Sequence, residues 1–286
     1  MKVPLLTAWS AAALVSAHCA PAKAVQFRDL FVFGDSYSDT GSFSQYSNGP
    51  TAVGYLAAEL GVTLDTSQNP HPGRNGVNFA QTAAKVTVGP TPPSKNPLSI
   101  NQQVAQFQNY VETKSLKFNP SSTLFFLEEG LNDAQTPLSD VTAAIMLQVQ
   151  TLYALGGRYF ELTTLPYLTG FSSSAVKFDL AYEGLVAQLQ HDFPEAVFGI
   201  SQFGHFYDQI VANPSQYGFT NATDACVVGD KVCATPNTYV FYYGGHPSTA
   251  AAKLVGDALY HEALALSDHS DGCCAESCRR HGAAWK

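Results

Sequence analysis

Ser36 stands where a catalytic nucleophile could lie. It follows the apolar run Leu30–Phe33, which is typical of a strand buried on both faces, and the break at Gly34. Ligands bind at the carboxyl edge of open parallel sheets, so a serine at that edge can attack a bound substrate, and a following helix would favour the developing anion. A serine that merely caps the next helix fits the same position. The local sequence leaves both interpretations open.

Strands and helices alternate along the rest of the chain. Apolar runs predict further strands at 77–80, 123–127, 159–163 and 196–200. Helices are predicted at 51–60, 100–111, 139–155, 174–191 and 248–266. This alternation predicts an α/β fold, a three-layer helix–sheet–helix sandwich around a five-stranded parallel sheet.

The N-terminal residues 1–24 have the features of a secretory signal peptide. A basic residue precedes a short apolar run, and Ala22-Lys23-Ala24 forms a cleavage site. The apolar run is too short to span a bilayer. We therefore expect a secreted, extracellular protein with one domain at 25–270 and a disordered, cysteine-containing tail at 271–286.

The charge of the chain limits its partners. Removal of Lys2 and Lys23 with the signal would take the formal charge from −8 to −10. Such an acidic protein is a poor partner for nucleic acid or an anionic membrane surface. No later stretch is long and apolar enough to anchor the protein in a membrane, and we expect a monomer.

Cysteine usage agrees with an oxidising compartment. Cys226 and Cys233 lie close together in a segment that reads as a polar loop, and we expect a disulfide between them. Three more cysteines lie in the tail: Cys273, Cys274 and Cys278. Their spacing lacks the usual paired pattern of a zinc site, so no metal site is predicted. Asn221-Ala222-Thr223 is an acceptor site for N-glycosylation.

Four short blocks in order resemble those of one hydrolase family. The segment from Gly34 to Gly41 resembles the first block of the GDSL, or SGNH, hydrolases. The later blocks are Asn78-Phe79-Ala80, Gly130-Leu131-Asn132-Asp133 and His246-Pro247-Ser248. The resemblance covers about residues 29–266 and implies a flavodoxin-like fold without a metal or organic cofactor. The subgroup that the chain most resembles is the fungal lipase/acetylesterase type, similar to family 16 carbohydrate esterases.

The resemblance implies roles for individual residues. Ser36 would attack an ester carbonyl, while His246 would take its proton and return it to the leaving alcohol. The oxyanion hole would comprise the backbone N–H of Ser36, the side-chain amide of Asn132 and the backbone N–H of Ala83. The family normally has glycine where Ala83 stands. The backbone there must avoid positive φ, or strain appears.

One expected residue is missing. The family's last block is Asp-x-x-His, but here it reads Tyr243-Gly244-Gly245-His246. A backbone carbonyl could orient the imidazole, which would give a Ser–His dyad. Another acid could replace the aspartate, and the candidates are Glu128, Glu129, Asp224 and Asp230. In the third alternative the protein is impaired as an enzyme.

These observations favour a secreted serine esterase that acts on short acyl esters. Its substrates would be small-molecule or oligosaccharide esters, including acetylated carbohydrate. A lipase for longer acyl esters is one alternative, although nothing in the sequence marks a lipid-binding lid. The other alternative is a catalytically impaired homologue that binds carbohydrate or a protein partner through the former cleft.

Overall fold

The computed structural model describes residues 25–41, 46–68, 71, 75–87, 97–168 and 172–268. The predicted signal peptide lies outside the described residues. So does the whole predicted tail with its three cysteines.

A parallel sheet of six strands forms the centre of the molecule, in the order β2-β3-β1-β4-β5-β6. The strands are β1 (Asp29–Phe33), β2 (Asp65–Thr66), β3 (Gly76–Asn78), β4 (Thr123–Leu127), β5 (Tyr159–Thr163) and β6 (Val197–Ser201). The α/β prediction is confirmed, and all five predicted strands are present. The short strand β2 makes a sixth, which its polar sequence did not indicate.

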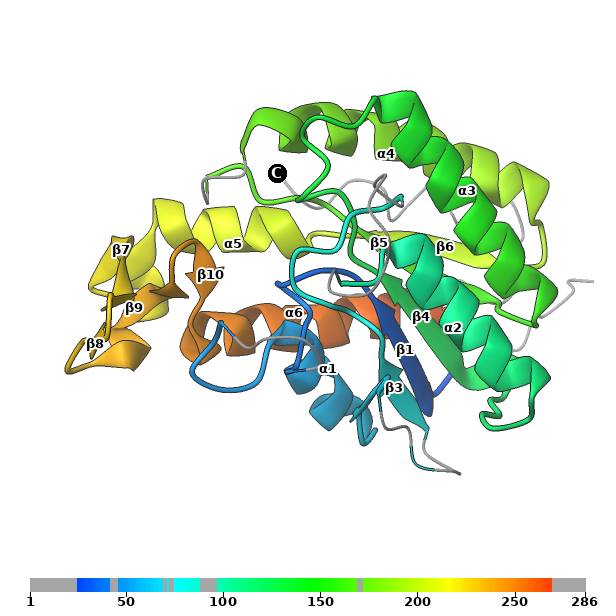
Figure 1. The fold of residues 1–286 in the computed structure, drawn as a ribbon, viewed down its shortest axis with the longest axis horizontal. Helices are drawn as coiled ribbons and strands as arrows, with labels where there is room; N and C mark the ends of the chain where they lie inside the picture. The colour runs from blue at the N-terminus through cyan, green and yellow to red at the C-terminus, as the bar shows by residue number, and fades with distance from the viewer. Residues whose placement is uncertain are drawn as a thin grey trace, which may run out of the picture.

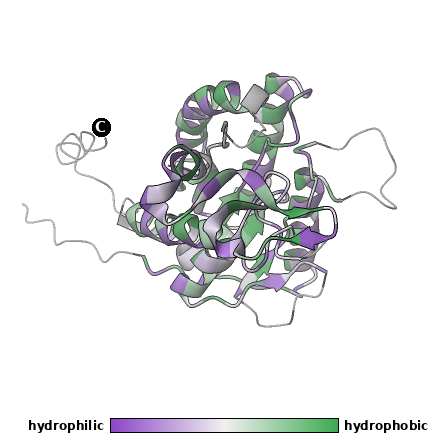
Figure 2. Ribbon diagram, turned by 90° about the vertical axis from the view of Figure 1, so that its left-hand side faces the viewer, coloured by the Kyte–Doolittle hydropathy of each residue, from purple (hydrophilic) through white to green (hydrophobic). Residues whose placement is uncertain are grey.

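Helices cover both faces of this sheet, with α2, α3 and α4 on one side and α1 and α6 on the other (Figure 1). The helices are α1 (Ala52–Leu60), α2 (Ile100–Glu112), α3 (Leu138–Ala154), α4 (Ser172–Asp192), α5 (Phe203–Ala212) and α6 (Thr249–Asp268). Short 3₁₀ turns are η1 (Pro120–Ser122), η2 (Pro214–Tyr217) and η3 (Pro236–Thr238). Helix α5 was not predicted. Both hydrophobic and hydrophilic residues are spread over the helices in Figure 2, as expected where one side packs on a sheet.

The local sequence explains where these helices begin and end. Helix α1 ends at Gly61, which adopts the left-handed conformation that closes a helix (φ 70°). Helix α2 begins at a capping box formed by Ser99 and Gln102.

The core is built around β1 and β4, whose side chains are almost all buried. Because helices cover both faces, these strands are continuous apolar runs rather than alternating ones. Phe31 packs against Phe107 and Phe125, with ring centroids 4.8 and 5.7 Å away. Burial of each such side chain stabilises the fold by about 1.5–3 kcal/mol. The strand ends that carry the polar segments are therefore firmly anchored.

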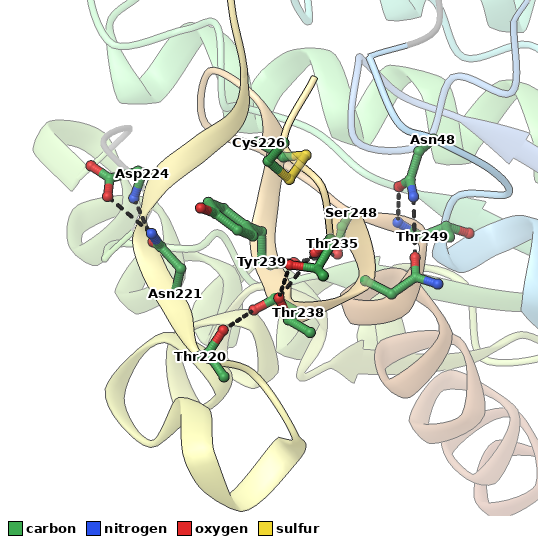
Figure 3. Close-up of a disulfide and its surroundings, with 12 residues drawn as sticks. Asn48, Thr220, Asn221, Asp224, Cys226, Thr235, Thr238, Tyr239, Ser248 and Thr249 are labelled. Atoms are coloured by element: carbon green, nitrogen blue, oxygen red, sulfur yellow. Dashed lines mark hydrogen bonds between the residues drawn. A yellow bond between two sulfur atoms is a disulfide. The ribbon is translucent and has the colours of Figure 1, made fainter. Parts of the chain in front are cut away.

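A second, smaller sheet lies at one end of the molecule, beside α5 and α6 (Figure 1). Its order is β10-β9-β7-β8, with β7 (Asn221–Val228), β8 (Lys231–Val232), β9 (Tyr239–Tyr243) and β10 (His246–Pro247). The prediction of a polar loop here is wrong, because the segment forms paired strands. A disulfide between Cys226 and Cys233 joins the β7–β8 hairpin at its base (Figure 3). This sheet carries His246 at its edge.

Several hydrogen bonds tie the small sheet to the rest of the protein. Asn48 accepts from the backbone N–H of Thr249 at 2.9 Å and donates to Asn237 at 3.2 Å (Figure 3). The Ser248 hydroxyl donates to the carbonyl of Tyr239 at 2.7 Å. The start of α6 and the strand before His246 are thereby held together.

The predicted glycosylation site opens β7. The side-chain oxygen of Asn221 accepts from the backbone N–H of Thr223 at 3.0 Å and of Asp224 at 2.9 Å, and its amide donates to the Asp224 carboxylate (Figure 3). The segment lies at the surface, and glycosylation of Asn221 stays a prediction.

Helix α5 packs so closely on the end of β5 that only glycine fits at position 204. A Cβ there would lie 2.2 Å from the carbonyl carbon of Leu165 and 2.4 Å from the nitrogen of Pro166. We expect Gly204→Ala to lower the free energy of unfolding by about 2 kcal/mol or more, measured by urea denaturation. Gly184→Ala is the control, since Gly184 is exposed on α4 and an added Cβ meets nothing within 4 Å. It should stabilise by about 0.5–1 kcal/mol. Equal effects of the two substitutions would contradict the packing.

Candidate active site

Ser36 and His246 meet at the carboxyl end of β1. The Ser36 Oγ lies 2.9 Å from the His246 Nε2, although the two residues are 210 positions apart in the chain. Ser36 lies in a turn, and the next helix begins only at Ala52 with Thr51 at its N-cap. The helix-cap interpretation of Ser36 is therefore wrong. So is the expectation that a helix follows it directly.

Buried polar side chains hold the loop that carries Ser36. The side-chain amide of Gln103 pairs with the backbone of Gly34, accepting from its N–H and donating to its carbonyl, both at 2.9 Å. The Asp35 carboxyl accepts from the N–H of Tyr37 at 3.1 Å. A Cβ at position 34 would lie 2.8 Å from the Glu128 carboxyl oxygen, so glycine is needed there. The nucleophile is thus held by buried polar contacts.

His246 is held by the main chain of its own hairpin. It pairs with Tyr243 across the β9–β10 turn, where Gly244 adopts a positive φ of 54°. This turn places the Tyr243 carbonyl oxygen 3.0 Å from the His246 Nδ1. Since a carbonyl can only accept, Nδ1 carries the proton and Nε2 accepts from Ser36. This contact corresponds to the first of the three alternatives, in which a backbone carbonyl orients the imidazole.

Two of the four acids considered as replacements are buried after β4, and two belong to the β7–β8 hairpin. Glu128 accepts from the backbone N–H of Asp35 at 3.0 Å, and Glu129 is buried at the end of β4. Asp224 accepts from Asn221, and Asp230 is exposed in the turn between β7 and β8. Tyr243, which stands at the position of the family's aspartate, contacts His246 through its carbonyl rather than its hydroxyl.

Two backbone N–H groups belong to the predicted oxyanion hole. Among the described residues, neither the N–H of Ser36 nor that of Ala83 donates a hydrogen bond. The turn that carries Ala83 is held by Asp39, whose carboxylate accepts from the N–H and the hydroxyl of Thr82 at 2.8 and 3.0 Å. Both N–H groups can therefore receive a new acceptor.

Ala83 adopts the positive φ that we expected to cause strain at this position. Its φ is 65°, in the left-handed region, which costs a residue with a Cβ about 1–2 kcal/mol. The strain follows from the turn, which glycine would adopt freely.

Asn132 stands beside this turn with both amide hydrogens engaged. Its Nδ2 donates to the Ala84 carbonyl at 2.9 Å and to the Asp35 carboxyl at 3.1 Å. It can donate to an oxyanion only by giving up one of these bonds. Its structural role is to join the Ala83 turn to the nucleophile loop.

Residues 30–259 match the GDSL-like lipase/acylhydrolase family. The chain belongs to this family. Its curated relatives include a GDSL esterase/lipase of Arabidopsis thaliana, 23% identical, with 85% of this chain and 84% of the relative covered. An acetylesterase of Thermothelomyces thermophilus is 26% identical over 89% of this chain and 96% of its own. The protein is thus a member of a family of carboxylic ester hydrolases.

Solved structures of other proteins align over most of the chain. TesA matches at a TM-score of 0.46 and 15% identity, covering 83% of this chain and 99% of its own. An acetyl xylan esterase from Geobacillus stearothermophilus matches at a TM-score of 0.44 and 16% identity, covering 85% of this chain and 96% of its own.

The GDSL site also contains aromatic residues that sequence reasoning missed. The rings of Tyr46 and Tyr37 lie 4.6 and 5.9 Å from the imidazole of His246, measured between centroids. The Tyr37 hydroxyl donates to the Gly245 carbonyl at 2.6 Å. The position of Tyr37 directly after the nucleophile is a weak sequence signal, and nothing in the sequence marks Tyr46.

No group of residues suited to a metal ion occurs in the described part of this GDSL protein. Among the helices that the structure describes, none is long and apolar enough to cross a membrane.

Buried carboxyl groups lie next to the loop that carries Ser36. Burial raises the pKa of Glu128 to about 7 and that of Glu129 to about 8. The pKa of Asp35 is also raised, by burial and then by the neighbouring Glu128. Asp133 serves the adjoining loop, accepting from the N–H of Val86 at 3.0 Å and the hydroxyl of Thr136 at 2.9 Å. The folded protein therefore holds protons that the unfolded chain would release near neutral pH.

We expect stability to fall as the pH rises from about 5 to about 8. The folded-state pKa of Glu129 exceeds its ordinary value, so the unfolded state binds fewer protons in this range and unfolding becomes easier. Glu129→Gln keeps the neutral shape and should raise the free energy of unfolding at pH 8 by on the order of 1 kcal/mol, and less at pH 5. Urea denaturation at both pH values measures this. Exposed Glu183→Gln is the control and should change little. A larger gain at pH 5 would contradict the assignment.

Proposed function

We propose that the protein hydrolyses carboxylic esters through an acyl-enzyme on Ser36, with His246 as general base. The observation that carries this proposal is the 2.9 Å distance between the Ser36 Oγ and the His246 Nε2. That distance lies within the range for proton transfer between a nucleophile and its base.

The proposed reaction has two halves. The Ser36 Oγ attacks the ester carbonyl while its proton passes to the His246 Nε2, and collapse of the tetrahedral intermediate breaks the bond to the alcohol, which leaves with that proton. Water then attacks the acyl-enzyme, giving its proton to His246, which returns it to Ser36 as the acid departs. Atoms and protons balance without a cofactor.

The base is ready in its neutral form. Burial lowers the pKa of His246, and the Tyr243 carbonyl partly offsets this. In serine proteases the partner of Nδ1 fixes the tautomer, and its loss lowers kcat by about 10⁴. The Tyr243 carbonyl supports the same tautomer here, which favours a working Ser–His dyad over the impaired homologue.

Preorganised donors support charge stabilisation in the intermediate. We propose the N–H groups of Ser36 and Ala83 as oxyanion donors, and Asn132 as a third when it releases Asp35. In subtilisin, one such side-chain donor contributes about 2.7–4 kcal/mol to catalysis.

Short acyl groups are the substrates that we propose, with acetylated carbohydrate as the natural class. The acetylesterase relative supports this choice. We further propose secretion, which the Cys226–Cys233 disulfide supports, since such bonds persist in oxidising compartments.

The first test is hydrolysis of p-nitrophenyl acetate. We expect Ser36→Ala to lower kcat/KM by about 10³-fold or more, because the acyl-enzyme cannot form. A fluorophosphonate should label the wild type and not this variant. Ser38→Ala is the control, since Ser38 is buried two residues away and should keep most of the activity. Equal rates for wild type and Ser36→Ala would contradict the proposal.

The second test is a series of p-nitrophenyl esters from acetate to decanoate. We expect kcat/KM to be highest for the acetate and to fall as the acyl chain lengthens. A maximum at eight or more carbons would instead support the lipase alternative.

A further inference from the structure

We propose that Tyr46 is a positioning residue whose aromatic ring stabilises the protonated form of His246 in place of the missing aspartate. This inference rests on the proposed function, in which His246 takes the proton of Ser36. It assigns a role to a residue outside the blocks that the family resemblance covers.

Aromatic rings of three tyrosines lie close to the imidazole of His246 or to one another. The centroid of Tyr46 lies 4.6 Å from that of His246, with the ring planes 37° apart. Tyr46 also stacks on Tyr243, at 5.1 Å and 14°. On the nucleophile side, the ring of Tyr37 lies 5.9 Å from the imidazole. Two aromatic rings are therefore within the roughly 6 Å over which a cation interacts with a π-face.

Catalysis creates a need for this interaction. When His246 accepts the Ser36 proton it becomes an imidazolium, and its partly buried position disfavours that charge. An aspartate would supply a full negative charge, whereas the Tyr243 carbonyl supplies only a dipole. The negative face of an aromatic ring is a second source of stabilisation, and it requires no additional titrating group.

The surroundings fix this arrangement. The Tyr37 hydroxyl donates to the Gly245 carbonyl at 2.6 Å and so holds the turn that carries His246. Tyr243 stands where the family has its aspartate, and its ring stacks on that of Tyr46 instead. The same position thus contributes its carbonyl to Nδ1 and its ring to Tyr46.

The test replaces Tyr46 by leucine and by phenylalanine. Leucine keeps an apolar cover but removes the π-face, so we expect kcat/KM for p-nitrophenyl acetate to fall about 5- to 30-fold. Phenylalanine keeps the face and should stay within about twofold of wild type. A merely structural role would not produce this difference in proteins of equal melting temperature.

A readout without turnover completes the test. In the Ser36→Ala background, NMR titration should show a lower pKa of His246 for Tyr46→Leu than for Tyr46→Phe. Other titratable groups near the site are the phenols of Tyr37, Tyr207 and Tyr243 and the carboxyl pair Asp35 and Glu128. These are common to both variants, so the difference between the variants reports Tyr46 alone.

The outcomes separate the two proposals. Loss of Ser36 dependence in the esterase assay would overturn the proposed function. A Ser36-dependent enzyme in which Tyr46→Leu changes neither kcat/KM nor the pKa of His246 would overturn only the role of Tyr46. Equal losses in the leucine and phenylalanine variants would also overturn it.

Discussion

The contact between Ser36 and His246 depends on one constraint, the docking of the small sheet against the main α/β layer. Ser36 is fixed by β1 at the centre of the six-stranded sheet, while His246 belongs to the edge of a separate four-stranded sheet. Polar contacts between the two parts include those of Asn48 with Thr249 and of Tyr37 with Gly245, and Val240 and Phe241 of β9 join the hydrophobic core. Because a shift of about 1 Å can cost 10²-fold in rate, this docking sets the quality of the site.

The main chain replaces side chains at several points of the site. The Tyr243 carbonyl lies against the His246 Nδ1, and within the described residues the N–H groups of Ser36 and Ala83 donate no hydrogen bond. Main-chain groups are positioned by the turns that contain them, so sequence changes at these positions are tolerated as long as the turn survives. The positive φ of Ala83 shows the cost of such tolerance, since the turn is kept without its glycine.

The floor of the site contains three buried carboxyl groups. Asp35, Glu128 and Glu129 are buried together, and burial raises the pKa of each. A neutral carboxyl can share a hydrogen bond with a neighbouring carboxyl, whereas two charged groups would repel each other. The loop of Ser36 thus rests on groups whose protonation links stability to pH.

The sequence by itself determined the five main strands, the alternation with helices and the position of Ser36 after β1, because apolar periodicity and strand ends are local properties. The ordered blocks also marked His246 and Asn132. Only the tertiary structure decided what orients His246, since the Tyr243 carbonyl is present whatever the side chain and its direction depends on the β9–β10 turn. The small sheet and Tyr46 escaped prediction for the same reason: their polar or isolated residues gain meaning only from partners far away in the chain.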